Sequence, residues 1–294
     1  MDSAAELHLR QLIFGRLAEI AAEHGVVTRA ELNSLQIGDQ SRRVIDQSRG
    51  IWNPQDLAAT LSIVSSPDGP YADTHISETL FAYDYRKGNT EGDNTKLRRA
   101  YELGLPIILL RKLRPSIYVP VFPAYVVSDD IANRKFFIAL DESLREIGDP
   151  LRLTAPERAY AERIMKQRLH QPEFRGRIML AYNESCAVCT LRHGKLLDAA
   201  HIISDDKPHG LPLVENGLSL CKIHHAAYDT NLLGISPDYV VQINAGLMED
   251  TDGPMLQHGL QEMNGRALTL PKRHADRPSK DRLAERFDEF KSAS

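Results

Sequence analysis

The chain has 294 residues, a formal net charge of −4, 42% hydrophobic residues and 26% charged residues. These values are those of a soluble globular protein of about two domains, and they exclude a protein that is basic overall, so any DNA-binding surface must be local. No apolar run reaches the length of about 18 residues that a membrane span needs, and acidic residues near the start argue against a signal peptide. The three cysteines lie in one segment, which favours a reducing, cytoplasmic location over a disulfide scaffold.

Residues 1–44 are predicted to be mainly helical. Apolar residues recur near helical spacing over residues 4–24, and Gly25 is suited to end that helix. Thr28, with Glu31 three residues later, predicts the capping box of a second and shorter helix. We interpret the segment as a helical lid that packs on the next domain. A helix-turn-helix DNA reader is the alternative, although the segment is not basic.

Residues 45–150 contain short β-branched and aromatic runs that are separated by Pro, Gly and Asp, which is typical of strands. A single helix is predicted from about Asn94 to Leu103, because Gly104 and Pro106 can end it there. We expect a compact, twisted, barrel-like α+β domain. The five predicted strands are LSIVSS, TLFAYDY, PIILLRKL, YVPVFPAYVV and KFFIAL.

Residues 151–182 are predicted to form a helical linker that begins at Thr154, with Pro156 in its first turn. The linker is rich in cations. Two interpretations remain open: a solvated helix face, or a helix that contacts phosphates next to a nuclease site. The cations are Arg152, Arg158, Arg163, Lys166, Arg168, Arg175 and Arg177.

Residues 183–270 carry the residues best suited to chemistry. Cys186 and Cys189 form one pair at metal-ligand spacing, and Cys221 and His224 form a second. Four such ligands in two short hooks predict a structural zinc site. His193 is an alternative fourth ligand.

Polar residues between and beside these hooks suggest phosphodiester hydrolysis, which needs a base, a cation and a group that orients the base. His201 is a candidate base, since the ordinary pKa of histidine lies near neutrality. Asp198 lies three residues earlier, so on a strand both can serve one site only if the strand bends or bulges. On a helix predicted over residues 222–229, His225 projects about 100° away from His224.

The blocks DAAHI, NGLSLC and HHAAYD resemble the HNH nuclease motif of the ββα-metal fold. The resemblance implies that His201 is the general base that activates water. It implies that Asn216 fixes the loop and the ring of that base. It also implies that His225 binds one divalent cation, Mg²⁺ or Mn²⁺, which holds the scissile phosphate.

Two positions depart from the family pattern. Ala200 stands where the family often has an Asp or His as the second metal ligand, so we nominate Asp198 as the nearest acid. His224 stands where many members have a fourth zinc cysteine. A plain zinc-knuckle binding module is the alternative, but such a site needs neither His201 nor His225.

The order of sequence blocks over residues 50–127 resembles an SRA/PUA-like domain fused ahead of HNH domains in modification-dependent restriction endonucleases. This resemblance implies that a modified cytosine is flipped into an aromatic pocket. Packing tyrosines and an ordinary helix cap at residues 93–94 are the structural alternatives. Candidate pocket residues are Trp52, Tyr71, Asp73, Tyr83, Tyr85, Arg86, Asp93 and Asn94, with Lys87, Arg98 and Arg99 as phosphate contacts beside them.

The resulting expectation is an α+β chain in five segments: a helical segment (1–44), an SRA/PUA-like recognition domain (45–150), a basic linker (151–182), a zinc-stapled HNH domain (183–270) and a charged tail (271–294). The tail is predicted to end in a short helix from about Ser279. The predicted activity is metal-dependent cleavage of double-stranded DNA that carries 5-methyl- or 5-hydroxymethylcytosine, by a possible homodimer and with no membrane partner. Alternatives are an HNH nuclease of other specificity in phage defence and a zinc-stabilised DNA-binding regulator that does not cleave.

Overall fold

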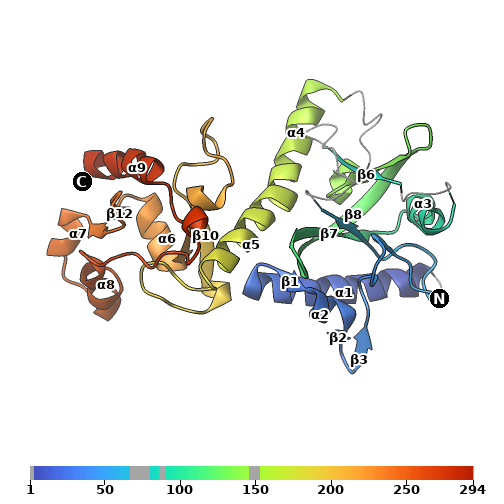
Figure 1. The fold of residues 1–294 in the computed structure, drawn as a ribbon, viewed down its shortest axis with the longest axis horizontal. Coiled ribbons are helices and arrows are strands. Elements are labelled where there is room, and N and C mark those ends of the chain that lie inside the picture. The colour runs from blue at the N-terminus through green and yellow to red at the C-terminus, as the bar shows by residue number, and fades with distance from the viewer. Residues whose placement is uncertain (1–2, 67–79, 86–90, 146–152, 294) are drawn as a thin grey trace. The chain divides into compact units, whose positions relative to one another are not determined.

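A computed structural model describes residues 3–66, 80–85, 91–145 and 153–293. The chain forms two compact units, Met1–Glu173 and Phe174–Ser294 (Figure 1). Within the described residues, no helix combines the length and the apolar character that crossing a bilayer requires. The finer division into five segments stays a prediction.

The first unit begins with α1 (Ser3–His24), which ends at Gly25 in a left-handed conformation with a φ of 72°. Strand β1 (Val27–Thr28) leads into the five-residue helix α2 (Arg29–Asn33), and the capping box between Thr28 and Glu31 is present. Both predicted helices are therefore confirmed. A short hairpin of β2 (Leu35–Ile37) and β3 (Gln40–Arg42) follows.

Helix α1 packs on the sheet of the same unit through Ile13 and Leu17, which are fully buried in a cluster that includes Ile108 and Leu110. A buried ion pair also holds the helix. Arg10 binds Glu6 at 2.6 Å and donates hydrogen bonds to three backbone carbonyl groups, those of Ala59, Thr60 and Pro106. These bonds replace the hydrogen bonds to water that a guanidinium loses on burial. They agree with the interpretation of α1 as a helix that packs on the domain that follows it.

Among the residues that the structure describes, seven strands form the sheet of the first unit, in the order β4-β5-β7-β8-β9-β6, with β1 also paired to β8. Strands β5 and β7 are parallel, whereas the other pairs are antiparallel. Every predicted strand is confirmed. The strands are β4 (Ile51–Trp52), β5 (Ser62–Ser65), β6 (Phe81–Asp84), β7 (Ile107–Arg114), β8 (Ile117–Asp130) and β9 (Lys135–Ala139).

The long strand β8 turns this sheet into a half-barrel. Its residues 117–124 pair with β7, its residues 125–130 pair with β9, and the register shifts within both ladders. Such irregularities bend and twist a strand, so the two halves of β8 can run in different directions and pair with different strands. Helix α3 (Asp93–Leu103) ends at Gly104 in the left-handed conformation, as its sequence predicts.

The predicted linker helix consists of three parts. Helix α4 (Ala155–Met165) starts with a capping box between Thr154 and Glu157, a π-helical turn covers Lys166–His170, and α5 (Gln171–Ala181) completes it. Arg168 binds Asp141 at 2.7 Å, so at least one of the linker cations has an internal partner. Arg175 also has internal partners, since it donates to the carbonyl groups of Gly194 and Leu197. The interpretation of the remaining cations as a solvated face or as phosphate contacts stays open.

The second unit contains a ββα arrangement of β10 (Leu197–His201), β11 (Gly217–Cys221) and α6 (Lys222–Asp229). Helix α6 confirms the helix predicted over residues 222–229. The remaining elements are β12 (Leu233–Ile235), β13 (Val241–Ile243), α7 (Ala245–Glu249), α8 (Pro254–Gly259) and α9 (Lys280–Ala293). Helix α9 confirms the predicted C-terminal helix and buries Leu283 and Phe290.

Candidate functional site

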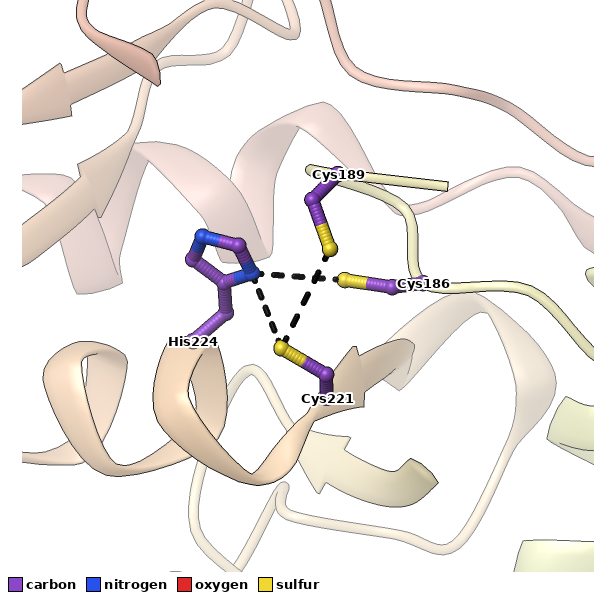
Figure 2. Close-up of side chains that lie close together, drawn as sticks. All are labelled: Cys186, Cys189, Cys221 and His224. Carbon is purple, nitrogen blue, oxygen red and sulfur yellow. Dashed lines mark hydrogen bonds between the residues drawn. The ribbon is translucent and has the colours of Figure 1, made fainter. Parts of the chain in front are cut away.

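The two cysteine and histidine hooks converge in the second unit. Cys186 and Cys189 lie in the turn after α5, Cys221 ends β11, and His224 lies in the first turn of α6. Figure 2 shows the three sulfur atoms and the imidazole ring of His224 pointing toward one another. The four ligand atoms all lie within 4.8 Å of one another, and they are the only group of three or more potential ligands that the described residues bring together in this way.

The dimensions of this cluster suit a tetrahedral ion. Nδ1 of His224 lies 3.1 Å from Sγ of Cys221 and 3.5 Å from Sγ of Cys186. The sulfur atoms of Cys189 and Cys221 are 4.0 Å apart. Zinc bonds of about 2.3 Å to sulfur and about 2.0 Å to nitrogen give tetrahedral edges of about 3.5–3.8 Å. The three thiols and the imidazole, at these separations, could therefore hold zinc.

The other nitrogen of His224 is also fixed. Nε2 donates to the backbone carbonyl of Gly259 at 2.8 Å, which leaves Nδ1 as the atom that faces the sulfurs. Burial favours the neutral ring, but hydrogen bonds with Cys186 and Cys221 outweigh it and raise the pKa of His224 to about 10 when no metal is bound. Hydrogen bonds with Cys189 and Cys221, and to a smaller extent with His224, lower the pKa of the Cys186 thiol. Without a metal, the imidazolium of His224 neutralises the negative thiolate charge of the cluster. A bound cation can take over that role.

A second polar group lies beside the cluster, between β10 and α6. Nδ1 of His225 is 3.3 Å from the carboxylate of Asp198, and Nε2 is 3.3 Å from that of Asp229. Lys222 binds the other oxygen of Asp198 at 2.6 Å. Burial raises the pKa of Asp198, but the hydrogen bonds and charges of Lys222 and His225 outweigh it and lower that pKa. Asp198 and His225 thus meet as an oxygen and a nitrogen donor of the kind that binds divalent cations.

His201 closes β10 and lies on a different face of the hairpin. The ladder between β10 and β11 runs without a register shift from Leu197 to His201, so Asp198 and His201 alternate to opposite faces as on a regular strand. The bend that would bring both onto one face is not present within the strand. The ring of His201 stacks on the ring of Phe174 from α5, with centroids 4.1 Å apart and planes 16° apart.

Asn216 is fully buried and fixes the loop that follows His201. Its side chain accepts from the backbone N–H of Ile203 at 2.9 Å and donates to the Ile203 carbonyl at 2.9 Å. It also donates to the carbonyl of Leu211 at 3.0 Å. The side-chain amide therefore satisfies three backbone groups of one loop, which holds that loop in a single conformation.

Sequence reasoning missed three residues that the structure places at these groups. Lys222 is three residues before His225 on α6, and this helical spacing was a usable signal for a shared face. Phe174 lies in what was read as the linker, and only the folded chain brings it to His201. The carbonyl of Gly259 is a backbone group, so no pattern of side chains in the sequence could predict its contact with His224.

The candidate base-pocket residues of the first unit are less clearly arranged. Tyr71, Asp73 and Arg86 lie outside the described residues, as does Lys87. The Tyr85 ring is 3% exposed and stacks on Phe136 with centroids 4.6 Å apart, while its hydroxyl donates to Asp129. These contacts place the Tyr85 side chain in the core of the unit.

The other pocket candidates have defined partners as well. Tyr83 is 7% exposed and donates to the carbonyl of Gly50 at 3.1 Å. Trp52 donates to the carbonyl of Arg43 at 3.0 Å. Asp93 and Asn94 lie in the first turn of α3, whose N-cap is Gly92. Asp93 binds Arg49 at 3.3 Å, and Asn94 is buried. The pocket itself stays a prediction.

Comparison with known proteins bears directly on the second unit. Residues 186–236 match the family model described as HNH endonuclease. A solved structure titled "Modification dependent TagI restriction endonuclease" is 14% identical, covers 90% of this chain and 90% of that chain, and has a TM-score of 0.30. The "Type IV phosphorothioation-dependent restriction endonuclease ScoMcrA" is 14% identical, covers 75% of this chain and 51% of that chain, and has a TM-score of 0.22. No curated protein matches the chain.

The matched residues include the Cys/His cluster, the β10–β11 hairpin and α6. The fold around them, two antiparallel strands followed by a helix, is the one that the motif implies. Residues 186–236 are therefore an HNH endonuclease domain, and the chain is a DNA-cleaving hydrolase.

Proposed function

We propose that the chain is a modification-dependent restriction endonuclease, which hydrolyses double-stranded DNA that carries 5-methyl- or 5-hydroxymethylcytosine. The nuclease part of the proposal rests chiefly on one observation, the meeting of Asp198 and His225 between β10 and α6 inside the matched HNH segment. The recognition part rests on the order of sequence blocks in residues 50–127, which resembles SRA/PUA-like domains.

In this proposal Asp198 and His225 would hold a divalent cation, Mg²⁺ or Mn²⁺, and Cys186, Cys189, Cys221 and His224 would hold zinc. Because Asp198 and His201 leave β10 on opposite faces, the proposal requires the scissile phosphate to reach both groups around the end of that strand. When bound, the divalent cation stabilises negative charge on the phosphate and on the leaving oxygen. Zinc supplies no chemistry, but it fixes the start of α6 against the turn after α5.

The residues of the chain supply the proton transfer. His201 takes a proton from a water molecule, the water oxygen forms a bond to phosphorus, and the bond from phosphorus to the leaving oxygen breaks. Asn216 holds the loop after His201 through its hydrogen bonds to Ile203 and Leu211, so the base keeps its position during the reaction. One such site cuts one strand, and two copies of the chain in a homodimer would cut both.

Selective cleavage tests this function. Matched duplexes that carry cytosine, 5-methylcytosine, 5-hydroxymethylcytosine or a backbone phosphorothioate are incubated with the full chain and Mg²⁺ or Mn²⁺. We expect cleavage of the methylated or hydroxymethylated duplex and none by the His201→Ala variant, which should still bind DNA. Equal cleavage of all four duplexes would overturn the modified-cytosine part. Binding without any cleavage would favour a zinc-stabilised regulator.

A further inference from the structure

A glycine stands directly opposite the candidate base. Gly217 pairs with His201 across the β10–β11 ladder, and residues that are opposite in an antiparallel pair share one face of the sheet. The φ of Gly217 is −138°, an extended value that any residue adopts, so backbone conformation does not require glycine there. The lack of space beside Gly217 is what requires a glycine at this position.

A side chain at this position would collide with α5. A Cβ atom on Gly217 would lie 2.6 Å from Cζ of Phe174 and 2.4 Å from Cδ1 of Ile178. Both neighbours are in the packed core, with Phe174 2% exposed and Ile178 fully buried, so neither can retreat into solvent. The Phe174 ring therefore occupies the volume that a side chain opposite His201 would fill.

The filled volume has a consequence for His201. The Phe174 ring lies nearly parallel to the imidazole at a centroid distance of 4.1 Å, so it covers one face of the histidine ring. The nitrogen atoms of imidazole donate and accept hydrogen bonds in the plane of the ring. Stacking on the face thus restricts the rotation of the ring, and the Nε2 atom of His201 is itself buried.

We propose that Phe174 is a positioning residue for His201 and that Gly217 is a glycine because it must admit the Phe174 ring. The proposal rests on the proposed role of His201 as general base. Phe174 holds the imidazole in the orientation in which a nitrogen can take the proton of water, and its electron-rich face also lies against the ring when His201 becomes positively charged. Both effects act on the chemical step and not on DNA binding.

The experiment compares Phe174→Leu, Phe174→Met and Phe174→Tyr in the full chain with Met179→Leu, a core change on the same helix. Phe174→Leu and Phe174→Met should lower kcat about tenfold or more while KM for the cleaved duplex and zinc content stay at wild-type values. Phe174→Tyr keeps the ring but adds a hydroxyl at Cζ, which faces Gly217, so it should recover kcat only in part, and Met179→Leu should match the wild type. Normal kcat in folded Phe174→Met would overturn the proposal.

A second measurement does not need cleavage. In the wild-type chain, the stacked Phe174 ring should shift the carbon-bound ring protons of His201 upfield in NMR spectra, and Phe174→Met should remove that shift. The signals are assigned by their loss in His201→Ala. Unshifted His201 protons in the wild type would overturn the stacked arrangement. If the shift is present but neither wild type nor variant cuts DNA, the proposed function fails and the positioning contact stands.

Gly217→Ala tests the reason for the glycine. The added methyl group meets Phe174 and Ile178, so we expect the upfield shift to shrink and kcat to fall while Phe174 is still present. A Gly217→Ala variant with wild-type kcat and wild-type His201 signals would refute the assignment of Gly217.

Discussion

Lys222 and Asp198 form a 2.6 Å ion pair across the junction of α6 and β10, on the same carboxylate that faces His225. Strand β10 thus supplies the acid Asp198, and α6 supplies two side chains that contact it, those of Lys222 and His225. Ala200 occupies the position where the family often has a metal ligand, so in the proposed function Asp198 is the acid of the divalent site.

Removing this acid should stop cleavage. Asp198→Asn deletes the negative oxygen that pairs with His225, so we expect kcat to fall at least about 100-fold at fixed Mg²⁺, with partial recovery at high Mn²⁺. Asp229→Asn is the matched control, because Asp229 contacts the other nitrogen of His225 and its side chain is 60% exposed. The measurement is the cleavage rate of each variant across a titration of Mg²⁺ and Mn²⁺. Equal reductions of kcat in Asp198→Asn and Asp229→Asn would contradict the special role of Asp198.

The ion pair predicts a pH-dependent stability. Because the pKa of Asp198 is lowered in the folded chain, its stabilising contribution is complete above the unfolded carboxyl pKa of about 3.9 and is lost as the pH falls through the lower folded value. Lys222→Met should reduce the free energy of unfolding by less than about 1 kcal/mol at pH 7, since Lys222 is 56% exposed. Urea unfolding at successive pH values should show this difference vanish in acid.

Lys280→Met provides the comparison for that series, because Lys280 is a similarly exposed lysine that pairs with Asp238 elsewhere in the second unit. A Lys222→Met difference that stays constant down to the lowest pH would show that the lysine stabilises the chain without acting through Asp198.

Metal removal should unfold the second unit. Structural zinc sites contribute on the order of 10 kcal/mol of apparent binding energy, and Cys221→Ser would remove a buried ligand from the proposed zinc site. We expect the purified variant to lose its zinc and much of its near-ultraviolet circular dichroism. His193→Ala should retain one zinc per chain, because His193 lies outside the ligand cluster. Elemental analysis separates the outcomes, and zinc loss in His193→Ala would reinstate that residue as a ligand.

The buried pair in α1 predicts a large stability change in the first unit. Arg10→Met leaves the carboxylate of Glu6 buried without its cation, which should cost about 3–5 kcal/mol of unfolding free energy. The double variant Glu6→Gln with Arg10→Met should recover part of that loss. Arg16→Met, which breaks an exposed pair with Glu19, should cost less than about 1 kcal/mol. Denaturant unfolding monitored by Trp52 fluorescence measures all three.

Local signals in the sequence were sufficient for elements whose ends are set by neighbouring residues. Thr28, Gly104 and Thr154 mark helix ends because capping bonds involve residues only a few positions apart. The Cys/His cluster was equally predictable, since its four residues fall in two short pairs. The side-chain amide of Asn216 bonds to the backbone of Ile203, and its role toward His201 stays a prediction.

Contacts between distant segments could not be read in this way. The residues around Phe174 were interpreted as linker because helical spacing says nothing about which partner a helix face will meet. Tyr83 and Tyr85 were read as stacking faces, and their burial follows from the pairing of β6 with β9, which alternation within one strand does not specify. Lys222 is the exception, because its three-residue spacing from His225 was visible in the sequence.

The short distance between Cys189 and Cys221 also makes the stability of the second unit sensitive to oxidation. Their sulfur atoms lie 4.0 Å apart, and a shift of about 2 Å would bring them to bonding distance. A bound metal keeps the thiolates apart as separate ligands, whereas an oxidant acting on the empty cluster can join them and close the site to zinc. Reductant and zinc would then be needed together to rescue the enzyme, since neither one alone rebuilds the cluster.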